Sequence, residues 1–410
     1  MKKFFALLLS LAMVLALVAC GQKDPTPDTP DTPDDTTPEV EYKVAMITDY
    51  GDITDQSFNQ TTYEACKAFA EDNSIEFSYF KPAGDNTADR VAMIEKAVDE
   101  GFNVIVMPGY AFGGAIVEAA PEFPDVKFIA LDVAAGDLLE TAVAKAGESY
   151  DYTPENWDLN KYVDMSNVYC AVYQEELCGY MAGYAAVKLG YKNLGFLGGM
   201  SVPAVVRYGY GFVQGVDAAA ADLGLTDVKL NYIYGGQFFG DADITAVMDT
   251  WYQGGTEVVF ACGGGIYTSA VDAAKKVNAK VIGVDVDQAG VIAKYAGVDG
   301  MTVTSAMKGL YPATYDTLTD VIVNGNWDKY VGKIATLGLV SGTDPEANYV
   351  QIPMGDGTQW SDSFTQDDYK AMVKDMFDGK ITVSNNTSSD VSAADFATVI
   401  TVDDQGSIKG

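Results

Sequence analysis

Two successive series of short apolar segments, each separated by segments with helical periodicity, are the feature that most constrains this chain. The first series has five apolar segments, near residues 43–48, 75–80, 103–107, 126–132 and 167–172. Between them, apolar residues recur at the spacing of one helix face, as Val91, Ile94 and Ala97 do. Short apolar strands alternating with amphipathic helices predict a parallel sheet with right-handed crossovers.

The second series repeats this pattern. Its expected strands lie near residues 193–198, 228–234, 257–262 and 280–285, with helices at 175–189, 210–223, 242–253 and 269–277. The chain is 410 residues long, which fits two or three domains. Two α/β series of similar size predict two doubly wound lobes with parallel sheets and a cleft between their strand ends.

Each expected lobe is built from two separate segments of the chain. We expect one lobe to contain residues 42–172 and 305–328, and the other to contain residues 173–304 and 329–383. The segment Asp137–Asp164 shows little periodicity and is expected to be a surface insertion. Residues 384–410 are rich in Ser, Asn and Asp, and we expect a loose extension there.

The first 41 residues have a separate character. Lys2 and Lys3 precede an apolar run from Phe4 to Val18, which is too short for a membrane span in the mature protein. The run ends in Leu-Val-Ala-Cys20, which resembles the lipobox of bacterial lipoproteins; the alternative is an ordinary secretory signal with a chance cysteine. We therefore expect cleavage of residues 1–19, lipidation of Cys20, and an extended acidic tether over 20–41. The protein would then be lipid-anchored on the extracytoplasmic face of a bacterial cell membrane.

The composition excludes several function classes. The net charge is −32, and it becomes −34 when residues 1–19 leave with Lys2 and Lys3 and no acid. Such a surface argues against nucleic acid as a partner. The sequence contains no histidine, which removes the usual general base and the commonest zinc ligand. We expect no metal, no cofactor and no enzyme activity. Four further cysteines look like buried apolar residues, and a disulfide among them stays open: Cys66, Cys170, Cys178 and Cys262.

The stretch from Thr48 to Gln60 is the expected ligand-facing turn. It joins the first strand to the first helix, at the sheet edge where ligands bind in open α/β folds. Ser57 and Gln60 have the spacing of a capping box, which predicts a helix starting at Phe58. An aromatic ring and Asn59 on the first helical turn suit a flat ligand with a polar edge.

The second series opens in a similar way. Its first strand is followed by Gly198-Gly-Met, a short loop and Tyr208. Phe58 and Tyr208 would then sandwich a planar ring across the cleft, each contributing on the order of 1 kcal/mol beyond area burial. The alternative is that both rings only fasten their own helices to the sheets.

Several short motifs, in this order, resemble the basic membrane protein family of lipoproteins over residues 42–325. They are Asp55-Gln-Ser-Phe-Asn-Gln, Pro108-Gly-Tyr-Ala-Phe, Phe123-Pro-Asp-Val-Lys-Phe, Glu175-Glu-Leu-Cys-Gly, Gly283-Val-Asp-Val-Asp-Gln and Thr304-Ser-Ala-Met-Lys. The resemblance implies the type I periplasmic-binding-protein fold. It also implies delivery of nucleosides to the permease of an ABC transporter.

The resemblance further implies a role for each matching position. Phe58 and Tyr208 resemble the stacking pair, Asn59 and Asp132 the groups that bond the base edge, with Asp49 beside them. The remaining matches concern the sugar: Asp285 as acceptor of ribose hydroxyls, Lys308 near it, and Gly264 in a glycine loop that lets backbone approach the ribose. A vicinal diol offers two donors to one carboxylate, which agrees with this role for Asp285.

Some positions depart from the family or have structural alternatives. Thr54-Asp55 stands where the family usually has two aspartates, and Tyr208 stands where Phe is common. Asp132 and Asp285 could instead cap the following helices, and Lys308 could simply neutralise Asp285. These departures leave the base preference open.

The sequence thus favours a monomeric nucleoside receptor, with purine nucleosides preferred, that closes around its ligand. A receptor for a sugar or another small polar solute is the alternative in the same fold. Sugar clefts favour tryptophan, but none of the four tryptophans lies at a strand end that is expected to line the cleft: Trp157, Trp251, Trp327 and Trp360. An enzyme such as a nucleoside hydrolase, using the Asp-rich turn, is a third hypothesis. Little supports it, because the sequence offers neither an activated nucleophile nor a histidine to act as the base.

Overall fold

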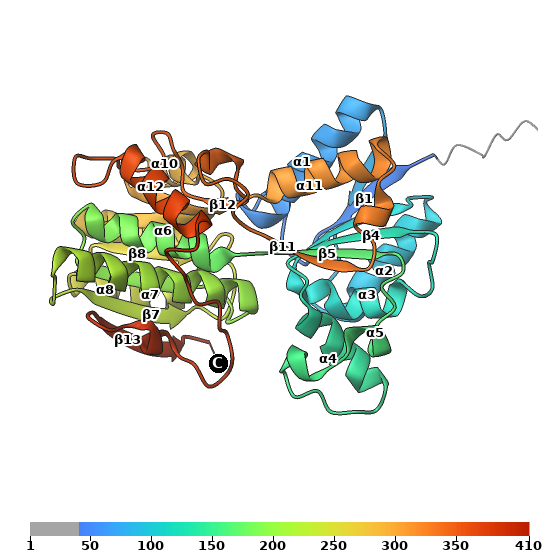
Figure 1. The fold of residues 1–410 in the computed structure, drawn as a ribbon, viewed down its shortest axis with the longest axis horizontal. Coiled ribbons are helices and arrows are strands. Elements are labelled where there is room, and N and C mark those ends of the chain that lie inside the picture. The colour runs from blue at the N-terminus through green and yellow to red at the C-terminus, as the bar shows by residue number, and fades with distance from the viewer. Residues whose placement is uncertain (1–40, 410) are drawn as a thin grey trace, which may run out of the picture. The chain divides into compact units, whose positions relative to one another are not determined.

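The computed structural model describes residues 41–409, and within them the strands form two sheets. The signal segment, the tether and the lipidation expected for residues 1–41 lie almost wholly outside this range. Figure 1 shows the first sheet at the right, in blue and teal, and the second at the left, in green and yellow. Among residues 41–409, no helix has both the length and the apolar character needed to cross a membrane.

The first lobe is built on a six-stranded parallel sheet with the order β11-β5-β4-β3-β1-β2. Its strands are β1 (Lys43–Ile47), β2 (Glu76–Phe80), β3 (Val104–Pro108), β4 (Lys127–Leu131), β5 (Val168–Tyr173) and β11 (Lys333–Leu337). Its helices are α1 (Phe58–Asn73), α2 (Thr87–Asp99), α3 (Gly113–Ala119), α4 (Ala135–Lys145), α5 (Leu159–Tyr162) and α11 (Leu310–Leu318).

Alternation along the strands puts helices on both faces of this sheet. Val44 and Met46 of β1 belong to the core that contains Phe69 of α1. Ala45 and Ile47 point to the other face, where α2, α3 and α4 supply the core. Because side chains alternate along a strand, a strand covered on both faces reads as a continuous apolar run, as β1 does.

The second lobe has a seven-stranded sheet with the order β12-β10-β9-β8-β6-β7-β13. Its strands are β6 (Asn193–Gly198), β7 (Lys229–Tyr234), β8 (Val258–Cys262), β9 (Lys280–Asp285), β10 (Thr302–Lys308), β12 (Val350–Gln351) and β13 (Thr401–Ser407). Its helices are α6 (Glu175–Lys188), α7 (Pro203–Leu223), α8 (Ala242–Gln253), α9 (Tyr267–Val277), α10 (Ala289–Ala296) and α12 (Gln366–Phe377). Only β12 runs antiparallel to its partner.

Helices α6 and α7 pack closely because four glycines lie in their contact. A Cβ at Gly179 would lie 2.3 Å from the Tyr208 carbonyl oxygen, and one at Gly215 would lie 2.1 Å from the Tyr180 carbonyl oxygen. Gly183 and Gly211 are equally constrained. This close contact fixes the first turns of both helices, which carry polar residues of the cleft.

Three chain segments join the lobes and bond to one another. The amide of Gln174, after β5, donates to the Leu337 carbonyl, and the amide of Gly309, after β10, donates to the Tyr349 carbonyl. The Tyr349 amide in turn donates to the Gly338 carbonyl. Any relative movement of the lobes therefore bends a small hydrogen-bonded bundle of connections.

The expected lobe boundaries need correction. Strand β11 pairs with β5, so residues 333–337 belong to the first sheet and not to the second. Strand β10 pairs with β9, so residues 305–308 lie in the second sheet. Both segments lie next to a connection, where the local pattern of apolar residues does not indicate which sheet the strand will join.

Two segments expected to be irregular are regular in part. The segment 137–164 was expected to be an insertion, but it begins inside α4, whose Leu138 and Ala142 are buried in the first core. The expected loose extension, 384–410, contains β13, which pairs in parallel with β7. Its polar sequence follows from its position at a sheet edge, where six of its seven residues are exposed.

Candidate functional site

The carboxyl ends of the two sheets face a common cavity. In each sheet the strand order reverses beside its first strand, between β1 and β3 and between β6 and β8. Loops that leave neighbouring strands in opposite directions open a crevice at that point, which is where open α/β sheets bind ligands. The cavity has a volume of about 440 Å³, within the usual range for small-molecule sites.

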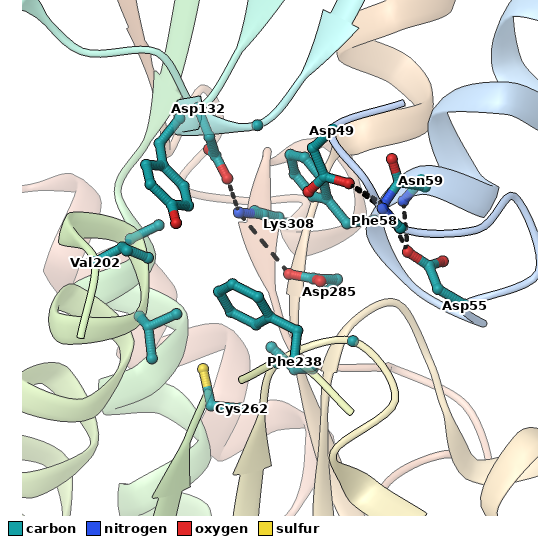
Figure 2. Close-up of a pocket in the computed structure, with 18 of the residues that line it drawn as sticks. Asp49, Asp55, Phe58, Asn59, Asp132, Val202, Phe238, Cys262, Asp285 and Lys308 are labelled. Carbon is teal, nitrogen blue, oxygen red and sulfur yellow. Dashed lines mark hydrogen bonds and ion pairs between the residues drawn. The ribbon is translucent and has the colours of Figure 1, made fainter. Parts of the chain in front are cut away.

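All eight predicted ligand-binding residues line this cavity: Asp49, Phe58, Asn59, Asp132, Tyr208, Gly264, Asp285 and Lys308. They come from five strand ends and from the N-terminal parts of two helices, and from both lobes. Figure 2 shows most of them around the space between the lobes. The structure therefore brings the predicted set together.

The turn after β1 is organised by two aspartates. Asp55 accepts hydrogen bonds from the backbone amides of Ser57 (3.0 Å), Asn59 (2.9 Å) and Gln60 (3.1 Å). Asp49 accepts from the Asn59 side-chain amide at 3.1 Å, and Asp55 does the same, so both N–H groups of Asn59 are used. Burial raises the pKa of Asp55, and these amide bonds oppose the shift.

The predicted capping box is therefore wrong. α1 does begin at Phe58, but Ser57 makes no side-chain cap, because the Asp55 carboxylate already satisfies the first free amides. The Ser57 hydroxyl instead donates to Asp285 Oδ2 of the other lobe, at 2.5 Å. Asp55 lies two residues before Ser57, so a search for a Ser-x-x-Gln box overlooks it.

Asp132 and Asp285 occupy equivalent places at the ends of β4 and β9. Both have left-handed backbone, with φ of 58° and 64°, which is uncommon for residues other than glycine. The caps of α4 and α10 fall at Ala134 and Gln288, so neither aspartate has the alternative role of helix cap. Such strained positions occur mostly at functional sites.

Lys308, at the end of β10, lies between these carboxylates. Its Nζ is 2.5 Å from Asp132 Oδ2, 3.4 Å from Glu175 Oε1 and 3.9 Å from Asp285 Oδ1. Burial lowers the pKa of its ammonium group, but Asp132, Asp285 and Glu175 outweigh that effect and raise the pKa above its ordinary value. The closest partner of Lys308 is thus Asp132 of the other lobe.

Burial raises the pKa of Asp132 to about 6 despite the neighbouring Lys308. Its Oδ2 binds the lysine, whereas its buried Oδ1 has no hydrogen-bond partner. The buried Oδ1 of Asn59 is likewise unpaired. Unpaired buried acceptors are rare in folded proteins, so these two atoms point to donors on a ligand.

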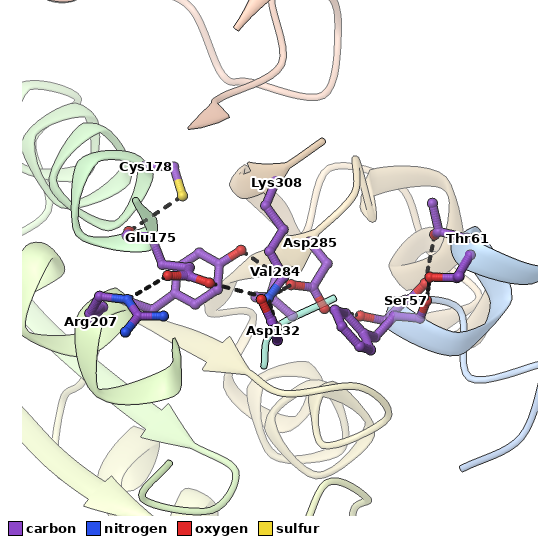
Figure 3. Close-up of polar contacts among 12 residues, drawn as sticks. Ser57, Thr61, Asp132, Glu175, Cys178, Arg207, Val284, Asp285 and Lys308 are labelled. Atoms are coloured by element: carbon purple, nitrogen blue, oxygen red, sulfur yellow. Dashed lines mark hydrogen bonds and ion pairs between the residues drawn. The ribbon is translucent and has the colours of Figure 1, made fainter. Parts of the chain in front are cut away.

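Sequence reasoning missed the ion pair behind Lys308. Arg207 Nε donates to Glu175 Oε2 at 2.7 Å, and the Glu175 side chain is fully buried. Figure 3 shows Arg207, Glu175, Lys308 and the two aspartates in one continuous network. Glu175 lies in a motif that carried the family resemblance, and its place at the start of a helix after β5 was a signal that could have been used.

The aromatic residues differ from the predicted pair. Tyr208 lines the cavity but is only 2% exposed, and its hydroxyl donates to Asp285 Oδ1 at 3.2 Å. Its ring packs edge-on against Phe260. Phe58 is half-buried, with Lys308 Nζ 4.7 Å from its ring centroid.

Phe238 is the aromatic residue of the second lobe that sequence reasoning missed. It is half-buried and lines the cavity, and its ring lies beside Asp285 in Figure 2. It follows β7 in the loop Gly235-Gly-Gln-Phe-Phe. A glycine-rich loop with two aromatics directly after a strand was the available signal.

The glycine loop after β8 lies against this segment. The Gly265 amide donates to the Phe238 carbonyl at 2.9 Å. Gly264 has a φ of 47°, and a Cβ there would lie 3.1 Å from the same carbonyl oxygen. Glycine is therefore favoured at 264 by both conformation and space, and the approach of this backbone to a ribose stays a prediction.

The four described cysteines are free and buried: Cys66, Cys170, Cys178 and Cys262. This answers the open question of a disulfide among them. Burial raises the pKa of each thiol, so none has the thiolate character of a nucleophile.

Comparison with known proteins agrees with this architecture. Residues 42–345 match the family described as ABC transporter substrate-binding protein PnrA-like. The chain is 25% identical over 389 residues to the ABC transporter nucleoside-binding protein BmpA of Lactococcus lactis, covering 92% of this chain and 96% of that one. It is 26% identical over 307 residues to an uncharacterized lipoprotein of Pyrococcus abyssi, covering 72% and 67% of the two chains.

Among solved structures, an ABC transporter solute-binding protein of Aeropyrum pernix has a TM-score of 0.59 at 20% identity, covering 84% of this chain and 88% of that one. At this identity the likeness concerns the fold. It confirms the predicted type I periplasmic-binding-protein architecture. The family consists of substrate-binding proteins without catalytic activity, so the prediction that the protein is no enzyme is also confirmed.

Proposed function

The chain belongs to the PnrA-like family of ABC transporter substrate-binding proteins, and we propose that the solute it delivers to its transporter is a nucleoside, with purine nucleosides preferred. The observation that carries this proposal is the pair of unpaired buried acceptors, Asn59 Oδ1 and Asp132 Oδ1, in a cavity that also holds exposed aromatic surface. A nucleoside has a π-face that can stack on the aromatic rings and hydrogen-bond donors that can pair with the two free acceptors.

Stacking supports the base end of the proposed ligand. Phe58 comes from the first lobe and Phe238 from the second, and both rings are half-buried in the cavity wall. We propose that the base lies between these two rings. Tyr208 then acts from the wall, because its buried hydroxyl holds Asp285. Each ring contact contributes on the order of 1 kcal/mol beyond the burial of area.

The polar residues support the remainder of the ligand. Asn59 and Asp132, on the first lobe, would bond the base edge, with Asp49 beside them and with Asn59 Oδ1 and Asp132 Oδ1 accepting from an exocyclic amine or ring N–H. Asp285 and Lys308 would bond the ribose hydroxyls, and Gly264 would let the backbone approach the sugar. In this role the charged partners give bonds about twice as strong as neutral ones.

The charges of the cavity support an uncharged ligand. Six aspartates line it, at positions 49, 52, 55, 132, 137 and 285, against the cations Lys81, Arg207 and Lys308. Each cation is already paired, with Asp52, Glu175 and Asp132 respectively. A phosphate group would meet a surplus of negative charge and no free cation among these residues, so nucleotides should be rejected.

A sugar or another small polar solute is the second candidate. The cavity wall contains phenylalanine and tyrosine rings and no tryptophan among its described residues. This composition favours the nucleoside, since carbohydrate clefts commonly present tryptophan. Identifying the solute that stays bound through purification by mass spectrometry would separate the two candidates.

Relatives that are lipoproteins support the expected location. We propose that Cys20 carries the lipid and that the binding body works as a monomer at the extracytoplasmic face of the cell membrane. Globomycin treatment of the producing cells, which blocks removal of lipoprotein signals, would leave residues 1–19 attached if this is right.

Calorimetry on ligand-stripped protein tests the main proposal. Guanosine, adenosine and inosine should bind in the nanomolar to micromolar range, whereas the corresponding 5′-monophosphates and free ribose should not. The 2′-deoxynucleoside should bind more weakly than the ribonucleoside, and Asp285→Asn should reduce that difference. Absence of binding heat with every nucleoside would refute the proposal.

A further inference from the structure

The segment after Val391 lies beyond the range that matches the family. It contacts the second lobe next to the loop of residues 235–241, which carries Phe238 and is called here the Phe238 loop. Residues 398–409 form what is called here the brace. In Figure 1 the brace is the red strand β13 beside β7. Its contacts run from α7 to the loop that carries Phe238.

The brace is fixed at its start by Asp217 of α7. This carboxylate, which is 7% exposed, accepts from the backbone amides of Thr398 (2.8 Å), Val399 (2.8 Å) and Ile400 (3.2 Å). It also accepts from the Thr398 hydroxyl at 2.6 Å. Four bonds to one buried carboxylate hold the chain at the edge of the sheet.

The middle of the brace extends the sheet. β13 pairs in parallel with β7 from Thr401 opposite Lys229 to Ser407 opposite Tyr234. The next amide, of Ile408, donates to the Tyr234 carbonyl at 2.9 Å, and the Ile408 side chain packs on the second-lobe core. The brace is therefore in register with the last residue of β7, directly before the Phe238 loop.

The end of the brace binds both sides of Phe238. Lys409 Nζ donates to Gln237 Oε1 at 2.9 Å and pairs with the Asp241 carboxylate. Gln237 itself donates to Asp241 Oδ2 at 3.0 Å and to the Phe239 carbonyl at 2.9 Å. A Cβ at Gly236 would lie 2.7 Å from the Lys409 carbonyl oxygen, so backbone lies against backbone here.

We propose that Lys409 is a positioning residue for ligand binding. Its side chain bonds Gln237 and Asp241, on either side of Phe238, and so acts as a clamp on the loop that presents the Phe238 ring to the cavity. The backbone of the loop is also held by bonds from Gly235 to Gly198, from Gly236 to Gly199 and from Gly265 to the Phe238 carbonyl, and the last of these is at Phe238 itself. Without the clamp, the ring gains alternative positions, and the ligand must order it on binding. The expected effect of Lys409 on ligand affinity rests on the proposed function. Its expected effect on the order of the loop does not.

The experiment compares Lys409→Ala with Lys374→Ala, a matched control whose lysine pairs with Asp378 at 2.6 Å on α12 and does not line the cavity. Lys409→Ala should weaken guanosine binding about three- to tenfold, because a solvent-accessible clamp contributes modestly. Lys409→Arg, which keeps the charge and the donors, should restore binding. Amide hydrogen exchange over residues 235–241 should become faster in Lys409→Ala only.

A double variant distinguishes positioning from general stability. If Lys409 acts through the ring, then Lys409→Ala should have no further effect on affinity in a Phe238→Ala background. An equal loss in both backgrounds, or unchanged exchange over 235–241, would overturn the proposal. If the wild-type protein bound no nucleoside, the proposed function would fail, and hydrogen exchange alone would still decide the role of Lys409.

Discussion

Ser57 and Asp285 come from opposite lobes and share a hydrogen bond of 2.5 Å between Ser57 Oγ and Asp285 Oδ2. Close by, Asp132 and Lys308 form a second bond across the cleft, and the Gln288 side chain donates to the Gln56 carbonyl at 3.2 Å. The residues assigned to the ligand therefore also hold the lobes together. Under the proposed function, closure and binding would depend on the same atoms.

Ser57→Ala removes the hydroxyl that bonds Asp285 only when the lobes are close. A hydrogen bond to a charged group contributes about 1.5–3 kcal/mol, so nucleoside affinity should fall about tenfold or more. Small-angle X-ray scattering of the unliganded protein should show a larger radius of gyration. Thr250→Ala, which removes a hydroxyl bound only within α8, should change neither quantity; an unaltered affinity in Ser57→Ala would contradict the role.

Lys308→Met leaves Asp132, Glu175 and Asp285 without their shared cation. Breaking a buried ion pair by removing one partner destabilises a protein by about 3–5 kcal/mol. The pKa of Asp132 is about 6 even with the lysine present, so this carboxylate is more protonated at pH 5 than at pH 8. The loss in melting temperature should therefore be larger at pH 8, and an equal loss at both values would argue against the network.

Glu176→Gln should stabilise the protein at alkaline pH. Burial raises the pKa of Glu176 to about 7 from an ordinary value of 4.5, so the folded state binds this proton more tightly than the unfolded state. The wild-type free energy of unfolding then decreases as pH rises from about 4.5 to 7. The amide lacks this loss, and its advantage at pH 8 over pH 5 should be on the order of 2 kcal/mol.

Urea unfolding at the two pH values measures this difference. Glu118→Gln serves as the control, because Glu118 is an exposed residue of α3. A pH dependence that is the same in Glu176→Gln and the wild type would show that the buried carboxyl does not titrate as described.

Phe238→Ala and Tyr208→Phe separate the two candidate stacking residues. Phe238→Ala removes a ring that lines the cavity and should weaken guanosine binding at least about tenfold. Tyr208→Phe keeps the ring and removes only the bond to Asp285, so the loss should be smaller and should fall mainly on the ribose end. A larger loss in Tyr208→Phe would return Tyr208 to the stacking role first expected for it.

The sequence predicted most of this architecture because the signals were local. β1, α1 and the strand-end aspartates follow directly from apolar runs and their flanking residues. It was harder to predict which sheet a strand joins. β11 and β13 pair with strands more than 150 residues away, and their own residues do not specify a partner. The place of Phe238 in the cavity wall was missed for the same reason, since its loop reaches the cavity through contacts that are distant in sequence.

Within the site, the capping box was wrong and the stacking role of Tyr208 stays a prediction, because several residues compete for one role. Ser57 has the right spacing for a helix cap, but Asp55 provides a stronger acceptor and frees the hydroxyl for Asp285. Tyr208 has the right position for stacking, but its burial between helix and sheet leaves little of its ring exposed. Spacing identifies the candidates, and the three-dimensional neighbours select among them.

The late pairing of β11 and β13 has a consequence for how the protein folds. β5 receives its neighbour β11 only after residues 333–337 are made, and β7 receives β13 only after residues 401–407. Each sheet therefore keeps an open edge throughout most of synthesis, and closing such distant pairs is the slow kind of folding step. Nearly the whole polypeptide must emerge before both sheets are complete.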